Sequence, residues 1–132
     1  MVNLARRDGD GPVSTRTAAT QEHVSYQLAC KLMQNLQKAG LLKSSMGPKG
    51  GFSLGRKPSQ ISLLDVIVAV QGPISVNRCV SIPKACSQYK SCSVKDRLAD
   101  LQTVINDGLA KITLDELAHK PVAKNEARQA KK

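Results

Sequence analysis

The sequence has almost no aromatic residues. It contains no Trp, one Phe (Phe52) and two Tyr (Tyr26 and Tyr89) among 132 residues. A core without aromatic side chains has to be built from Leu, Ile, Val and Ala, which favours helices with aliphatic faces. The same scarcity disfavours a protein that binds single-stranded nucleic acid, because such proteins stack bases on aromatic side chains.

Long apolar segments are also absent. No run approaches the roughly 20 apolar residues that span a bilayer, and the N-terminus lacks the apolar core of a secretory signal. We therefore expect a cytoplasmic protein with no membrane contact, in which thiols stay reduced. No Ser-His-Asp set, Walker loop or paired-carboxylate pattern is visible either, so the sequence does not predict an enzyme.

Acidic residues are scarce at both ends of the chain, whose formal net charge is +10. Residues 1–60 carry nine Lys and Arg against three Asp and Glu, whereas residues 61–118 carry six of each. Residues 119–132 carry five against one and predict a disordered basic tail. A basic N-terminal half beside a neutral segment is typical of a module that binds a polyanion such as DNA, although a merely soluble basic surface would look the same.

Two helices separated by a short break are predicted within the basic half. Ser14 is a suitable N-cap for the first helix, and Ser25 is a suitable N-cap for a longer second helix that ends before Gly40. Helical spacing predicts that the second helix buries Leu28, Leu32, Met33 and Leu36. This order is typical of a helix-turn-helix, in which the second helix enters the major groove. The candidate DNA contacts, which would otherwise form a solvated helix face, are Ser25, Tyr26, Gln27, Lys31 and Gln34.

A β-hairpin is predicted directly after these helices. Residues 41–45 and 52–54 are the expected strands, and a glycine-rich turn over residues 47–51 joins them. A basic hairpin in this position is a wing. Its Lys43 and Lys49 are therefore expected to contact the phosphate backbone of DNA.

The second half of the chain predicts two further helices. One spans residues 63–71, and a longer one spans about 94–112 with a narrow apolar seam that can pack against its symmetry mate. The expected fold class is mainly α with a small β-hairpin wing, a winged helix-turn-helix plus a long dimerisation helix. The predicted divisions are a DNA-binding domain (1–73), a cysteine-bearing loop (74–93), a dimerisation helix (94–118) and a tail (119–132).

Three of the four cysteines lie in the predicted loop. Cys79, Cys86 and Cys92 are separated by six and five residues, without the tight C-x-x-C pair of a zinc ribbon. Soft thiolates favour an iron–sulfur cluster or zinc, and three of them leave a fourth position for another ligand or for solvent. Redox-active thiols without a cluster, or inert thiols, remain alternatives. Cys30 stands alone on the second helix and is expected to be structural.

Several motifs in this order resemble the Rrf-type family of bacterial winged-helix transcription regulators, in its cluster-binding IscR- and NsrR-like branch. The resemblance spans roughly residues 2–118. It is carried by residues 36–41, the wing 47–54, residues 61–67 and 72–74, the three spaced cysteines, and residues 112–117. The wing followed by the cysteine triplet is a specific combination, which a helix-turn-helix alone would not be.

The resemblance implies a homodimer that places two helices in successive major grooves of a palindromic double-stranded DNA operator. It also implies an iron–sulfur cluster on Cys79, Cys86 and Cys92, with 2Fe–2S favoured over 4Fe–4S. The expected function is a repressor that senses redox, nitric oxide or iron status. The alternatives are a thiol-based redox regulator without a cluster and a metal-binding accessory protein in cluster assembly.

The chain departs from the family pattern in three places. Family members begin with a longer first helix, which supplies a fourth ligand in some of them, and we expect residues 1–7 to match only its end. Lys95 stands where IscR-like proteins have a histidine ligand. Met46 stands where an arginine is common in the wing. The operator sequence therefore cannot be transferred from a relative.

Overall fold

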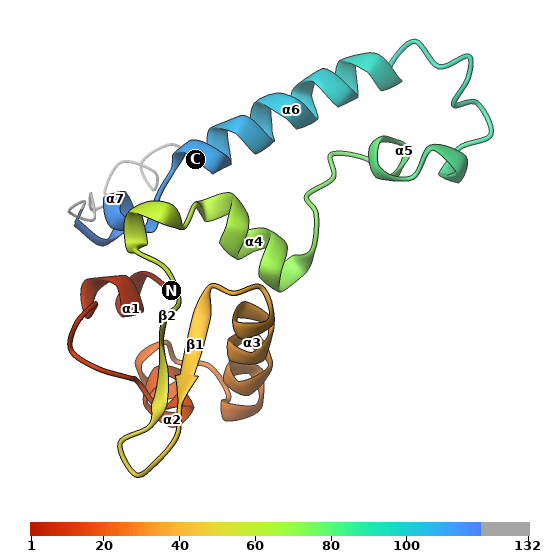
Figure 1. Cartoon of the computed structure of the whole chain (residues 1–132). Coiled ribbons are helices and arrows are strands. Elements are labelled where there is room, and N and C mark those ends of the chain that lie inside the picture. The colour runs from red at the N-terminus through yellow and green to blue at the C-terminus, as the bar shows by residue number, and fades with distance from the viewer. Residues whose placement is uncertain (120–132) are drawn as a thin grey trace, which may run out of the picture.

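The computed structural model describes residues 1–119, so the predicted tail lies outside the described residues from position 120 onward. None of the described helices is both long and apolar enough to cross a bilayer. In Figure 1 the helix-turn-helix and hairpin form the lower part, and a long helix runs across the top. The elements in chain order are α1 (Val2–Arg6), α2 (Thr15–Gln21), α3 (Tyr26–Lys38), β1 (Leu42–Ser45), β2 (Gly51–Leu54), η1 (Pro58–Gln60), α4 (Leu63–Gln71), α5 (Arg78–Ser81), η2 (Pro83–Ala85), α6 (Lys95–Lys111) and α7 (Leu114–His119).

Local hydrogen bonds begin and end the helices of the helix-turn-helix as predicted. The Thr17 N–H donates to Ser14 Oγ at 3.1 Å at the start of α2. The Leu28 N–H donates to Ser25 Oγ at 3.2 Å at the start of α3. After α3 the chain turns at Gly40, whose φ of 74° lies in the left-handed region that favours glycine.

The buried face of α3 differs from the predicted one by one position. Ala29, Met33 and Leu36 are buried, whereas Leu28 is 44% exposed, so its predicted burial is wrong. Helix α3 packs against α2, and both helices bury an alanine, Ala29 on α3 and Ala19 on α2. Close approach of two helices favours small side chains at the contact, and a rule based on hydrophobicity alone ranks leucine above alanine at such a position.

The hairpin is a two-stranded antiparallel sheet in which Leu42 pairs with Leu54 and Lys43 pairs with Ser53. Leu42 and Leu54 are buried in the core, so the neighbouring Lys43 and Ser53 lie on the opposite face. The sheet is extended by Val13, which exchanges two backbone hydrogen bonds of 2.8 Å with Phe52. The loop between α1 and α2 is thereby fixed beside the wing.

The C-terminal end of α6 is attached to the winged domain through the backbone. The Leu63 N–H donates to the Ile112 carbonyl at 2.8 Å, and the Leu114 N–H donates to the Ile61 carbonyl at 2.9 Å. Ile61 and Leu114 are among the most deeply buried side chains of the described residues. The other end of α6 projects away from the core and carries the segment with α5, η2 and the three cysteines (Figure 1). The region 74–93, expected to be a loop, therefore contains two short helical turns.

The two sides of α6 have different surroundings. Leu98 and Leu109 are half-buried, and α6 contacts α4 and α5. By contrast Val94, Leu101 and Ile105, which belong to the predicted seam, are exposed together with Val104. The seam therefore packs only in part within the chain, and an apolar stripe remains on the surface.

Candidate DNA interface and cysteine segment

Three polar side chains form one exposed face of α3. Gln27, Lys31 and Gln34 are all exposed and are spaced by four and three residues, which places them on the same side of the helix. The hairpin lies beside α3, and Gln37 Nε2 donates to Ser44 Oγ of β1 at 3.0 Å. The structure therefore presents the predicted groove-reading side chains next to the wing.

Tyr26 is held at the start of α3 by its neighbours. The Arg16 guanidinium of α2 lies 5.2 Å from the centre of the Tyr26 ring. A hydrogen bond with the Cys30 thiol raises the pKa of the Tyr26 hydroxyl above its ordinary value, as does any charge on that thiol, against the opposing effect of Arg16. The sequence analysis did not predict a role for Arg16. The only sign of one was that Arg16 is a cation in the first helix of the helix-turn-helix.

The remaining predicted DNA contacts, Ser25, Lys43 and Lys49, lie in three different settings. Ser25 uses its hydroxyl oxygen as the cap of α3, which gives it a positioning role. Lys49 is exposed in the turn of the wing. Lys43 points away from α3, because its neighbour Ser44 is the residue of β1 that contacts α3. The structure therefore does not bring Lys43 together with the α3 side chains.

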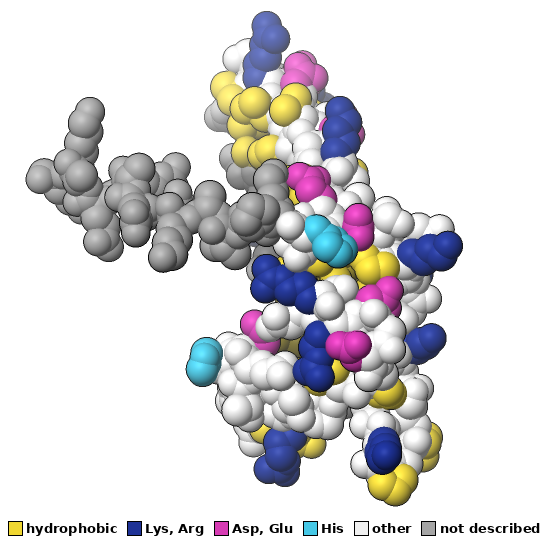
Figure 2. Space-filling model, turned by 90° about the vertical axis from the view of Figure 1, so that its left-hand side faces the viewer, with side chains coloured by type: hydrophobic (Ala, Val, Ile, Leu, Met, Phe, Trp, Pro, Cys, Tyr) yellow, Lys and Arg dark blue, Asp and Glu magenta, His cyan; other side chains and the backbone are white. Residues whose placement is uncertain are grey.

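Two adjoining cavities lie between the hairpin and the α1–α2 loop, one at the outer face of the strands and one at the turn of the wing. The larger, of about 380 Å³, is lined by Arg7, Asp8 and Lys43 among others. The smaller, of about 290 Å³, also includes Arg7 and reaches Lys49. Figure 2 views the molecule from this side and shows it hollowed between its two lower lobes, with Lys or Arg side chains on both. Sequence reasoning did not single out Arg7, which precedes an irregular turn with no recognisable spacing.

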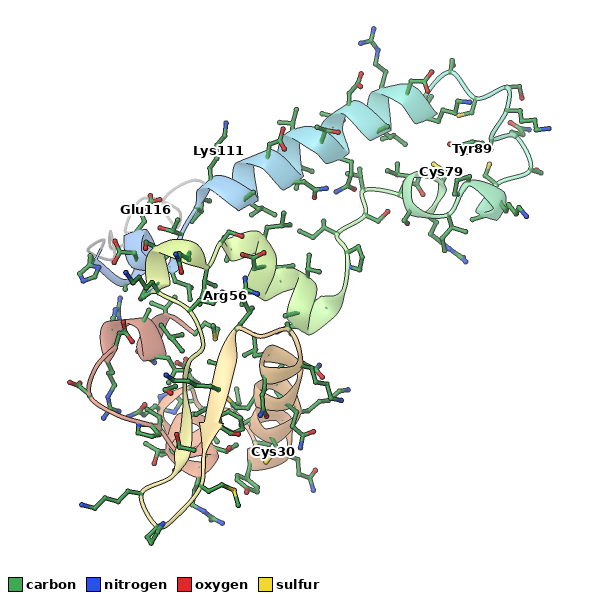
Figure 3. All side chains as sticks on the ribbon, viewed as in Figure 1. Cys30, Arg56, Cys79, Tyr89, Lys111 and Glu116 are labelled. Atoms are coloured by element: carbon green, nitrogen blue, oxygen red, sulfur yellow. The ribbon has the colours of Figure 1, made fainter. Side chains whose placement is uncertain are left out.

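The cysteine segment lies at the opposite end of the molecule from α3. In Figure 3 Cys79 lies on α5, far from Cys30 on α3. Cys79, Cys86 and Cys92 are all free thiols, and Cys86 is the exposed one. At the end of this segment the Lys95 ammonium lies 4.6 Å from the centre of the Tyr89 ring. Lys95, which stands where a histidine ligand was expected, therefore makes a ring contact.

The types of the possible ligand residues favour a metal cluster, whereas their arrangement does not form a metal site. Three thiols in one segment are ligands that suit an iron–sulfur cluster. Within residues 1–119, however, no group of three or more His, Cys, Asp or Glu side chains is placed to hold a metal ion. The residue types fit a cluster, but the segment does not present a preformed site.

One buried side chain connects the cysteine segment to α6. Gln102 is 8% exposed and is the buried polar residue of the described core. Its Oε1 accepts the Val76 N–H at 2.7 Å, and its Nε2 donates to Asn106 Oδ1 at 3.0 Å. Val76 is three residues before Cys79, so this bond attaches the start of the segment to the middle of the long helix.

Together, the helix-turn-helix, the basic wing and the long projecting helix define a winged-helix DNA-binding regulator. The chain belongs to the Rrf2 family, described as iron-dependent transcriptional regulators, which matches residues 1–120.

Relatives in this family are similar along most of their length. The HTH-type transcriptional regulator CymR of Bacillus subtilis is 30% identical over 89% of this chain and 80% of its own. The HTH-type transcriptional regulator IscR of Pectobacterium atrosepticum is 32% identical over 90% of this chain and 72% of its own. These relatives are transcription regulators, and this chain is likewise a regulator and not an enzyme.

Solved structures agree with the fold. The structure of CymR, the global cysteine regulator of B. subtilis, superposes with a TM-score of 0.70 at 29% identity, covering 89% of this chain and 85% of CymR. The structure of T. potens IscR gives a TM-score of 0.64 at 32% identity, covering 88% of this chain and 76% of that one. The winged-helix architecture predicted from the sequence is confirmed.

Proposed function

We propose that this regulator is a cytoplasmic repressor that senses redox, nitric oxide or iron status through an iron–sulfur cluster on Cys79, Cys86 and Cys92. The observation that carries the proposal is the gathering of three free thiols in one segment at the projecting end of α6. The description of the family as iron-dependent supports iron as the bound element. When bound, a cluster supplies a redox-active centre that reacts with oxygen and nitric oxide. We favour 2Fe–2S over 4Fe–4S, and in either cluster three thiolates leave one position for a different ligand.

The protein's own residues provide the route from this segment to DNA. Gln102 holds the backbone of Val76, so a rearrangement of the segment acts directly on α6. The C-terminal end of α6 is joined to the winged domain by the backbone bonds of Ile61 and Leu114. A ligand shifts such a system only by binding its two conformations with different affinity. We therefore expect segment ordering and DNA affinity to change together.

A thiol-based redox regulator is the second candidate. Cys86 is exposed, and the three thiols are not arranged as a ready-made metal site. The relatives include CymR, the global cysteine regulator of B. subtilis, and a Staphylococcus aureus CymR has been solved in an oxidized form. An accessory protein in cluster assembly receives no such support, because the similar proteins are DNA-binding regulators.

The DNA-binding function is tested by the salt dependence of binding to the duplex upstream of the protein's own coding region. Each phosphate neutralised by a Lys or Arg contributes a slope of about −0.9 to the plot of log affinity against log salt. We expect a steep negative slope between 50 and 200 mM salt, measured by fluorescence anisotropy. Cluster transfer to an acceptor protein without any salt-sensitive DNA binding would instead support the accessory role.

We further propose that the exposed stripe of α6 is covered by a second copy of this chain. Leu101 is 53% exposed, Val104 67%, Val94 55% and Ile105 40%, and they lie along one side of the helix. A helix that leaves a narrow apolar stripe in water is suited to pack against its own symmetry mate. The resulting homodimer would present two α3 helices to a palindromic operator.

Leu101→Lys is expected to convert the dimer to a monomer, because it places a charge in the centre of the apolar stripe. Affinity for a palindromic duplex should fall about 100-fold, since two linked half-site contacts become one. Thr103→Lys is the matched control, because it adds the same side chain at an exposed position outside the stripe. Sedimentation velocity and anisotropy measure both effects. A Leu101→Lys protein that stays dimeric would contradict the proposed interface.

A further inference from the structure

The smaller cavity beside the wing has cationic side chains from two separate elements. Arg7, in the loop after α1, and Lys49, in the turn of the wing, both line it. Arg6 donates to the Ala118 carbonyl at 3.2 Å and has a structural role. Arg7 lines this cavity and also two neighbouring ones, which it shares with Asp8 and with Glu22. Two cationic side chains, one from each element, therefore line the smaller cavity.

Two hydroxyl groups complete the wall of this cavity. Ser14 Oγ and Thr17 Oγ1 lie 2.8 Å apart, and Ser14 Oγ also accepts the Thr17 N–H. Only one of the two hydroxyl protons is used in the bond between them. Whichever group donates, the other keeps a proton that is free to donate to a third partner.

The smaller cavity has a lining without acidic side chains. None of the residues that line it is Asp or Glu, whereas Asp8 lines the larger neighbouring cavity. Its volume of about 290 Å³ is roughly ten times the share of one liquid water molecule, which leaves room for a phosphate group. Arg and Lys side chains form charge-assisted hydrogen bonds with phosphate oxygens. The cavity therefore has the charge, the donors and the space that a phosphate needs.

We propose that this slot, formed by Arg7, Ser14, Thr17 and Lys49, binds a phosphate of the DNA backbone. The slot lies between α2 and the wing, at the same end of the molecule as the start of α3 (Figure 1). A duplex that meets α3 and the wing brings a phosphodiester strand to this position, which is why DNA is the occupant and not a free anion. The inference rests on the proposed DNA-binding function, and it assigns a contact between the turn of the wing and the start of α2.

Arg7→Gln tests the slot in the full-length protein. Removing one phosphate contact should reduce the magnitude of the salt slope by about one per protomer and weaken binding to related and unrelated duplexes equally. We expect a loss of about tenfold at moderate salt, as for a hydrogen bond to a charged group. Arg97→Gln on α6 is the matched control and should change neither quantity. Circular dichroism and the thermal midpoint of both variants show that the fold is kept.

Three outcomes separate the possibilities. An Arg7→Gln protein with an unchanged salt slope overturns the slot. Inorganic phosphate that binds the wild type in an Arg7-dependent way, with DNA binding unaffected by the substitution, also overturns DNA as the occupant. Failure of the wild type to bind any duplex counts instead against the DNA-binding function.

Discussion

Replacing Cys79, Cys86 and Cys92 together with serine is expected to abolish iron retention and, with it, any iron-dependent change in DNA affinity. Thiolates are soft ligands that hold iron–sulfur clusters, and a serine hydroxyl does not replace them. The core of the winged domain contains none of these three side chains, so the variant should remain folded and should still bind DNA. The loss should therefore be confined to sensing.

The measurement is made on protein purified under anaerobic conditions. Iron and acid-labile sulfide are determined per chain, the visible spectrum is recorded, and DNA affinity is compared before and after chelation. Cys30→Ser is the control, because Cys30 lies on α3 at the other end of the molecule and is not a proposed ligand. The control should keep the iron and the visible absorption.

The same experiment separates the two candidate functions. Wild-type protein that is colourless under anaerobic conditions, and that gains no iron on reconstitution, rules out the cluster. If its DNA affinity nevertheless changes with a thiol oxidant, and Cys86→Ser removes that change, the protein is a thiol-based regulator. Cys86 is the informative position, since it is the exposed member of the three.

Ile61→Ala is expected to lower the free energy of unfolding by about 2–5 kcal/mol, the range for truncating a large buried aliphatic side chain. The Ile61 side chain is 0% exposed, and its carbonyl accepts the Leu114 N–H at the junction of the winged domain with the end of α6. A cavity there would weaken the core and this junction at once. Urea denaturation at fixed protein concentration measures the effect, because dimerisation makes apparent stability depend on concentration.

Met46→Ala is the control for this prediction. Met46 is 99% exposed in the wing, and surface substitutions of this kind usually change stability by no more than about 0.5 kcal/mol. An Ile61→Ala protein as stable as the Met46→Ala protein would show that the junction does not contribute to the core.

The local elements of this protein were determined by the sequence itself. The caps at Ser14 and Ser25, the turn at Gly40 and the helix begun by the Ser62–Asp65 capping box depend on hydrogen bonds between residues at most a few positions apart. Such bonds follow from residue type and spacing, so the helix-turn-helix, the hairpin and the family resemblance are all recognisable in the amino-acid sequence alone.

The candidate sites depended on contacts between distant residues, which spacing does not describe. Tertiary packing buried Ala29 and left Leu28 exposed on α3. Fixing the α1–α2 loop beside the hairpin brought Arg7 to the same cavity as Lys49. Gln102 reads as an ordinary polar helix residue until its bond with Val76 is seen. Tertiary structure alone decided these pairings. The same local sequence patterns are present whether the chain between two partners brings them together or keeps them apart.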